Sequence, residues 1–199
     1  MTVSERQRPR TKPPEVRREE LMDAAQRLFL EKGFFATSVA EIVNAADVAK
    51  GTFYLYFQTK DDVLGALQAR FVERFCQKTD AAVAAASSGS WVRRLDVWMQ
   101  ACVEAYLDDV ALHDLVFHQF QPATRGMKRA NPVVDQLSSF LAEGCSEGAF
   151  VFSDVRLTAV MLFNAMHGAV DDCLAEGAPI DRQKLVGVVA DFCRRAVGS

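Results

Sequence analysis

Apolar residues recur at helical spacing in almost every stretch of the chain beyond residue 14. Over residues 15–32 they fall at positions i, i+3, i+4, i+7 and i+8, namely Leu21, Ala24, Ala25, Leu28 and Phe29. This spacing places them on one face of an amphipathic helix. Gly33 follows directly, and glycine suits the C-terminal cap of a helix. The pattern predicts a first helix over 15–32.

Two short helices are predicted next. Ser38 is followed three residues later by Glu41, the spacing of a capping box at a helix N-terminus. A third helix begins around 49–50, and Phe53 and Phe57, four residues apart, are expected to share one core. Two short helices joined by a tight turn and packed on a longer one form a three-helix unit with a helix-turn-helix. A unit of about 45 residues is only marginally stable alone.

The remainder of the chain is also predicted to be helical. Further helices are expected over 60–86, 91–109, 111–120, 154–176 and 181–197, with a loop over 121–129. Another helix is expected to start at Asn131-Pro132 and to end around 144–148. The alternation typical of β-strands is not evident. The fold class is therefore all-α, with a basic arm over 1–14, a helix-turn-helix domain over 15–59 and a larger helical domain over 60–199.

Composition points to an ordinary globular protein. The 199 residues are 50% hydrophobic and 25% charged, and no apolar run approaches the roughly 20 residues of a membrane span. Met1–Pro14 has no apolar core and so does not resemble a signal peptide. We expect a cytoplasmic protein without a membrane partner. The five cysteines are widely spaced without a CxxC pair, and we interpret them as reduced, buried thiols, with a redox switch as the alternative.

Charge is distributed unevenly along the chain. Residues 1–60 hold ten Lys/Arg and eight Asp/Glu, a net of +2, whereas residues 61–199 hold thirteen and eighteen, a net of −5. A basic end on an acidic body suggests that one end contacts phosphate. Three interpretations of the arm Arg6–Lys12 remain open: entry into the minor groove, disorder, or charge attraction without a defined pose.

The region from Phe29 to Lys60 carries residue types suited to DNA. Thr37 and Ser38 offer hydroxyls and backbone N–H groups at a helix N-terminus, which suits a phosphate. Gly51 permits a close approach to a groove, and Lys60 is placed to contact the DNA backbone. Polar groups project from the third helix, which is narrow enough for the major groove; they belong to Lys50, Thr52 and Tyr54. The alternative for these side chains is an ordinary solvated helix face.

Residues 16–64 resemble the TetR family of bacterial regulators. The resemblance is carried by the segments FLEKGF at 29–34, TSV at 37–39, EI at 41–42 and VAKGTFYLYF at 48–57, and by Lys60. It implies a homodimeric transcriptional regulator, expected to be a repressor and not an enzyme, without a cofactor. It further implies a palindromic DNA operator and a small, largely hydrophobic effector held by the larger domain. Binding of the effector would move the two helix-turn-helix domains of the dimer apart and release the DNA.

The resemblance also implies roles for individual residues. Lys50, Gly51 and Tyr54 would lie nearest the bases. Phosphate contacts would come from Ser38, Thr52, Tyr56 and Lys60, joined by Arg17. The dimer would form through the last two helices, 154–176 and 181–197.

Two positions depart from the family pattern. Asp47 stands where a turn glycine is usual, and aspartate tolerates a left-handed backbone better than most residues. Ala49 stands where serine is common, and it cannot cap the following helix, a loss of about 1 kcal/mol. Asp47 is in a position to provide that cap instead.

Aromatic residues and methionines in the larger domain are candidates for an apolar effector pocket, although most must also build the core. Asn164 and His167 lie in an otherwise apolar stretch and are candidates for orienting a polar end of the ligand, with polar dimer contacts as the alternative. The expected effector-binding set is Trp98, Met99, Cys102, Tyr106, Phe117, Phe120, Met161, Asn164 and His167.

The histidines do not predict a metal site. His113 lies close to acidic residues and His167 is four residues before Asp171, but no third ligand has a characteristic spacing. No metal is therefore expected, and no nucleophile motif suggests catalysis. Two other functions stay open: a DNA-binding protein without effector control, which a filled core favours, and a TetR-like body acting through protein contacts, which an absence of DNA affinity favours.

Overall fold

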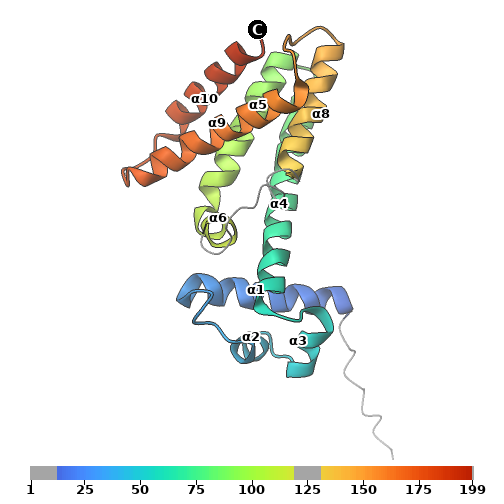
Figure 1. The fold of residues 1–199 in the computed structure, drawn as a ribbon, viewed down its shortest axis with the longest axis vertical. Coiled ribbons are helices and arrows are strands. Elements are labelled where there is room, and N and C mark those ends of the chain that lie inside the picture. Colours follow the sequence, from blue (N-terminus) through green and yellow to red (C-terminus); the bar gives the residue numbers. More distant parts are fainter. Residues whose placement is uncertain (1–12, 119–130, 199) are drawn as a thin grey trace, which may run out of the picture. The chain divides into compact units, whose positions relative to one another are not determined.

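The computed structural model describes residues 13–118 and 131–198. Within these residues the chain forms nine helices and no strand (Figure 1). The all-α fold class is confirmed, and each predicted helix that falls within the described residues is present. The chain divides into two compact units, Met1–Leu67 and Gln68–Ser199. The expected arm residues Arg6–Lys12, the loop 121–129 and Phe120 lie outside the described residues.

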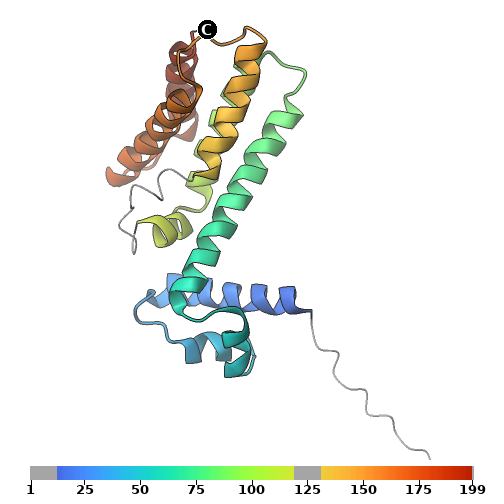
Figure 2. The same ribbon diagram turned by 45° about the vertical axis from the view of Figure 1, so that its right-hand side comes forward.

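The first unit contains three helices and the start of a fourth. They are α1 (Pro14–Lys32), α2 (Val39–Ala45), α3 (Lys50–Tyr56) and the first residues of α4 (Lys60–Ala85). α1 ends where Gly33 takes a φ of +89° and its N–H donates to the carbonyl oxygen of Phe29. α2 packs against both α1 and α3 (Figure 2). The core of this unit includes Leu21, Ala25, Phe29, Ile42 and Phe53.

The second unit is a helical bundle built on the rest of α4. It contains α5 (Trp91–Asp108), α6 (Val110–Phe117), α8 (Pro132–Ser146), α9 (Val155–Ala175) and α10 (Arg182–Ala196). Side-chain caps begin four of these helices: Ser90 for α5, Asn131 for α8, Asp154 for α9 and Asp181 for α10. Such caps satisfy the backbone N–H groups that a helix start leaves without partners.

The second unit has its core around α5, which packs against α9 and α10, while α8 packs on α9. Large side chains such as Trp98 and Tyr106 are fully buried there. All five cysteines are free, and burial raises the pKa of Cys102 and Cys193, the latter to about 12. These two thiols therefore stay protonated and act as small hydrophobic side chains, as the sequence predicts. The prediction of burial is wrong for Cys76, Cys145 and Cys173, which are half-buried.

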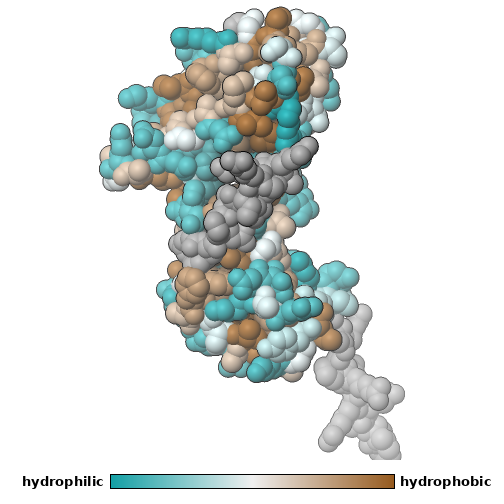
Figure 3. Space-filling model, viewed as in Figure 1, coloured by the Kyte–Doolittle hydropathy of each residue, from teal (hydrophilic) through white to brown (hydrophobic). Residues whose placement is uncertain are grey.

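The surface of the second unit mixes hydrophilic and hydrophobic residues on the face that carries α9 (Figure 3). Two apolar residues of α9, Leu157 and Met161, and two of α10, Val188 and Phe192, are exposed. Across the described residues, no helix combines the length and the apolar character needed to cross a membrane.

Candidate nucleic-acid interface and effector site

The capping box at the start of α2 forms as predicted. Backbone N–H of Glu41 donates to Oγ of Ser38, and the Glu41 carboxylate accepts from the backbone N–H of Ser38 at 2.8 Å. Lys32 also pairs with this carboxylate. Hydrogen bonds from Lys32 and Ser38 lower the pKa of Glu41 from 4.5 to about 2. The box therefore fixes the direction in which α2 leaves the α1–α2 loop.

The turn between α2 and α3 depends on a left-handed residue. Asp47 has a φ of +52°, which confirms the expectation that aspartate replaces the usual glycine here. α3 then begins at Lys50, and its N-cap residue is Ala49. Within the described residues no side chain caps this helix, so Asp47 does not compensate for the missing hydroxyl. The N–H of Thr52 donates to the carbonyl oxygen of Ala49, at 2.8 Å, and closes the first turn.

Two aromatic side chains fix α3 to the rest of the first unit. Phe53 and Phe57 are buried with ring centroids 5.8 Å apart, which confirms their predicted place in the core. The guanidinium of Arg18 lies 5.4 Å from the centroid of the Phe57 ring. Since these residues bury one side of α3, the opposite side is left at the surface.

The exposed side of α3 carries the residues predicted to lie nearest the bases. Lys50 and Gly51 are exposed, and Tyr54 is 52% exposed. A Cβ built on Gly51 has no protein atom within 4 Å, and its φ is not positive. Nothing in this chain's own packing therefore requires glycine at this position. Leu55, which was not among the predicted contact residues, is 78% exposed on the same short helix.

Thr52, Tyr56 and Arg17 are half-buried. The guanidinium of Arg17 forms an ion pair with Glu20 at 2.9 Å. All three side chains keep part of their surface accessible to a partner.

Two residues expected at phosphates have internal partners. Thr37 is buried, and its hydroxyl donates to the carbonyl oxygen of Gly33 at 2.9 Å. The expectation of a Thr37 side-chain contact with DNA is therefore corrected, because the hydroxyl already bonds within the loop. Lys60 is half-buried, and its ammonium donates to the carbonyl oxygens of Phe34 and Thr37.

Residues 21–67 match the family described as bacterial regulatory proteins, tetR family. The helix-turn-helix domain of this chain is therefore of the TetR type. The structures similar to the chain include the fatty acid degradation regulator FadR from Bacillus halodurans, with a TM-score of 0.73 and 24% identity over 93% of this chain and 97% of that one. The family match over residues 21–67 covers the helix-turn-helix described above. By this N-terminal domain the chain is a helix-turn-helix transcriptional regulator.

Relatives along the whole chain are more distant. The uncharacterized HTH-type transcriptional regulator YhgD from Bacillus subtilis is 22% identical over 182 residues, which cover 87% of this chain and 92% of YhgD. FadR from Bacillus subtilis, solved in complex with stearoyl-CoA, has a TM-score of 0.65 and 21% identity over 90% of this chain and 97% of that one. Other curated relatives match over only 15% to 43% of their own length.

The expected effector-binding residues fall into two groups in the second unit. Four are buried in the core: Trp98, Met99, Cys102 and Tyr106. Phe117 and His167 are half-buried, whereas Asn164 is exposed with its amide donating to the carbonyl oxygen of Val160. Met161 is 61% exposed, so its side chain does not line an enclosed pocket in this chain.

A small cleft lies between α4 and the α5–α6 region of the second unit. Its volume is about 110 Å³, and its lining includes the apolar side chains of Phe71, Phe75 and Leu112. Three basic residues of α4 also border it, namely Arg70, Arg74 and Lys78, together with the acidic Asp109. Lys78 is paired with Asp108 at 2.7 Å. These α4 residues were not predicted from the sequence, because their spacing alone is that of any solvated helix face.

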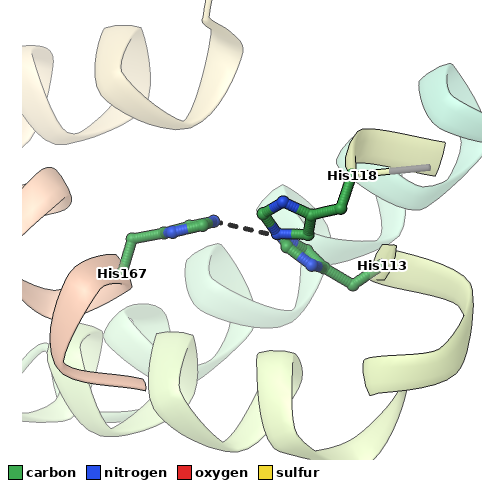
Figure 4. Close-up of side chains that lie close together, drawn as sticks. All are labelled: His113, His118 and His167. Atoms are coloured by element: carbon green, nitrogen blue, oxygen red, sulfur yellow. Dashed lines mark hydrogen bonds between the residues drawn. The ribbon is translucent and has the colours of Figure 1, made fainter. Parts of the chain in front are cut away.

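The fold also brings the three histidines together in the second unit (Figure 4). His113 is buried in α6, His118 directly follows α6, and His167 is half-buried in α9. Burial and the neighbouring His167 lower the pKa of His113 to about 4, and burial lowers that of His167. His113 is therefore neutral at pH 7, and neutral imidazole is the form that binds metals.

Proposed function

We propose that this chain is a homodimeric repressor that binds a palindromic DNA operator and is released by a small, largely hydrophobic effector. The observation that carries the proposal is the two-sided character of α3. Phe53 and Phe57 fix one side in the core, while Lys50, Gly51 and Tyr54 occupy the accessible side. A short helix presented in this way suits the major groove, where Lys and Tyr side chains reach base edges and phosphates.

The exposed apolar residues of α9 and α10 support a dimer. Leu157 and Met161 are four residues apart in α9, as are Val188 and Phe192 in α10, so each pair lies on one helix face. α9 and α10 pack against each other. Adjoining apolar surface of this kind is typical of protein interfaces, and a twofold dimer would bury the same face of both copies. We therefore assign Met161 to this face.

A twofold dimer sets the spacing of the operator. Two copies of α3 would enter successive major grooves, with half-site centres about 34–36 Å apart, or one helical turn of DNA. Ser38, Thr52, Tyr56 and Arg17 would contact phosphates around each half-site. Lys60 keeps a third N–H after its two internal hydrogen bonds, and we propose that this N–H donates to a phosphate.

The cleft beside α4 is our proposed entry for the effector. Aromatic lining with a basic border suits a ligand that has an apolar body and an anionic end. FadR from Bacillus subtilis binds stearoyl-CoA in its structure, and a ligand of that general character fits this lining. The cleft volume of about 110 Å³ is below the roughly 300 Å³ of small ligand sites, so the effector would have to open it.

The same small volume favours a second candidate, a DNA-binding protein without effector control. The two candidates differ in whether any small amphipathic anion weakens DNA binding. Release of a bound duplex by a fatty acyl anion at concentrations below its micelle formation would favour the first. Unchanged DNA affinity across a panel of such anions would favour the second.

Binding measurements on Tyr54→Ala test the proposed DNA interface. On a duplex that the wild type prefers, we expect this variant to lose roughly 1–3 kcal/mol of specific binding. Its binding to a random duplex should change much less, because that binding depends on phosphates. Equal affinities of wild type and variant for both duplexes would contradict the assignment of α3 as the reading helix.

A further inference from the structure

The three histidines of the second unit form a cluster that the proposed function does not use. His113 lies in α6, His118 is the residue after its last turn, and His167 lies in α9. One ring nitrogen of each lies within 4.8 Å of the other two (Figure 4). The shortest separation is 3.2 Å, between Nε2 of His113 and Nε2 of His167. Residues more than 50 positions apart in sequence therefore point ring nitrogens at one another.

The polar contacts of this cluster need more hydrogen atoms than the neutral imidazole rings can supply. His167 Nδ1 lies 3.1 Å from a carboxylate oxygen of Asp171, and His113 Nδ1 lies 3.5 Å from one of Asp114. With the Nε2 pair, these are three contacts that each need one hydrogen atom, but two neutral imidazoles supply only two. Whichever tautomers are chosen, one of the three contacts has no hydrogen atom, so the lone pairs of two acceptor atoms face each other there. A cation between the Nε2 atoms removes this conflict.

We propose that His113, His118 and His167 bind one divalent transition-metal ion of the Zn²⁺ class. A tetrahedral ion with Zn–N bonds of about 2.0–2.1 Å holds its ligand nitrogens roughly 3.3 Å apart. The 3.2 Å separation of the two Nε2 atoms fits that geometry without movement. The side chain of His118 is 48% exposed, so rotation about its side-chain bonds is available to complete the set.

The groups behind the ligands support the same assignment. Asp171 accepts a hydrogen bond from Nδ1 of His167 and another from the hydroxyl of Tyr106 at 2.5 Å. A carboxylate behind a histidine ligand fixes the ring and directs its other nitrogen toward the metal. Asp114 occupies the corresponding place behind His113. The two carboxylates also give the site the negative charge that offsets a divalent cation.

Aromatic side chains pack against the rings of His113 and His167. The His113 ring packs against Phe71 and Phe117, with centroids 5.7 and 4.9 Å away, and Phe163 packs against His167. Three imidazole ligands leave a fourth position of a tetrahedral ion open for water or an anionic group. Imidazole nitrogen suits Zn²⁺, Ni²⁺ and Cu²⁺ and not Mg²⁺ or Ca²⁺. A bound ion would join α6 to α9 and so stabilise the second unit.

The test uses the full-length chain without a histidine tag, stripped of metal by a chelator. Titration with Zn²⁺ followed by calorimetry should give one tight site per chain. The melting temperature should rise with the Zn²⁺ concentration, because a ligand that binds only the folded state stabilises it. Mg²⁺ should produce neither effect. Absence of a tight site at one Zn²⁺ per chain would overturn the proposal.

Substitutions in the proposed site distinguish Zn²⁺ bound by the histidines from Zn²⁺ bound by cysteine thiols elsewhere in the chain. His118→Ala alters an exposed side chain, so the fold is retained, and the affinity for Zn²⁺ should fall at least tenfold. Asp171→Asn should weaken it about 10–100-fold by loss of support for His167. Asp172→Asn, the next residue and exposed, is the matched control and should bind as the wild type does.

Cobalt gives a second measurement that does not depend on affinity. Co²⁺ bound to the wild type should show the intense visible absorption of a tetrahedral ion, and His167→Gln should abolish it. Unchanged Zn²⁺ affinity in both histidine variants would show that the ion binds elsewhere. The two facing imidazoles would then share only a proton, and the proposal would be wrong.

Discussion

Lys60 donates a hydrogen bond from its ammonium group to the carbonyl oxygen of Thr37, at 2.5 Å. A second bond reaches the carbonyl oxygen of Phe34 at 2.8 Å, and the ammonium lies 4.7 Å from the centroid of the Phe34 ring. These contacts link the first residue of α4 to the loop between α1 and α2. Lys60 therefore has a structural role in the DNA-binding unit in addition to its proposed phosphate contact.

Replacement of Lys60 by methionine should destabilise the first unit. The two carbonyl oxygens lose a charged donor, and hydrogen bonds to charged groups contribute about 1.5–3 kcal/mol. Amide hydrogen exchange should quicken in residues 34–60 by a corresponding factor, with α8 to α10 unchanged. The matched control is Lys50→Met, an exposed position where the stability should change by less than about 0.5 kcal/mol. Equal exchange in both variants would contradict the structural role of Lys60.

Gly51→Ala should raise the stability of the first unit and lower its affinity for DNA. The added methyl group meets open space and a helical backbone, so α3 should gain about 0.5–1 kcal/mol from the better helix former. The same methyl group would prevent a close approach to DNA, and specific affinity should fall at least tenfold. Thermal unfolding and duplex titration measure the two effects. A variant of equal or higher stability with wild-type DNA affinity would contradict the placement of Gly51 at the bases.

Acid should remove the stabilising contribution of Glu41. Its pKa is about 2 in the folded chain, against 4.5 without partners. Since folding lowers this pKa, the contribution is complete above pH 4.5 and is lost as the pH falls toward 2. Glu41→Gln should therefore be less stable than the wild type at neutral pH, with a difference that shrinks below pH 4.5. A difference that is constant from neutral pH down to pH 3 would show that the ion pair with Lys32 is unimportant.

A charge on the exposed face of α10 should prevent dimer formation. Phe192 is 53% exposed in the single chain, and its burial at a dimer interface would forbid a carboxylate there. Phe192→Glu should weaken association by about 2 kcal/mol or more, as measured by sedimentation. Val151→Glu changes another exposed apolar residue of the second unit that lies outside α9 and α10, and it should leave the association unchanged.

The local features of the fold follow from short sequence patterns. The capping box of Ser38 and Glu41, the left-handed Asp47 and the buried pair Phe53 and Phe57 were all predictable, because neighbours in sequence determine them. The end of α1 at Gly33 was predictable for the same reason.

Features that depend on tertiary contacts were not predictable. The internal bonds of Lys60 link residues more than 20 positions apart. His113 and His118 are five residues apart, a spacing that does not by itself place two side chains on one helix face. His167 joins them from α9, so no sequence spacing identifies the set.

Selection of binding sites from a pool of random duplex DNA tests the central claim most directly. The full-length chain, at near-physiological salt, is expected to enrich an inverted repeat whose half-site centres are about 10–10.5 base pairs apart. Tyr54→Ala, carried through the same selection, should enrich it weakly or not at all. A folded wild-type dimer that enriches no sequence, whether or not small ligands have been removed, would contradict the account of α3 as a reader of DNA.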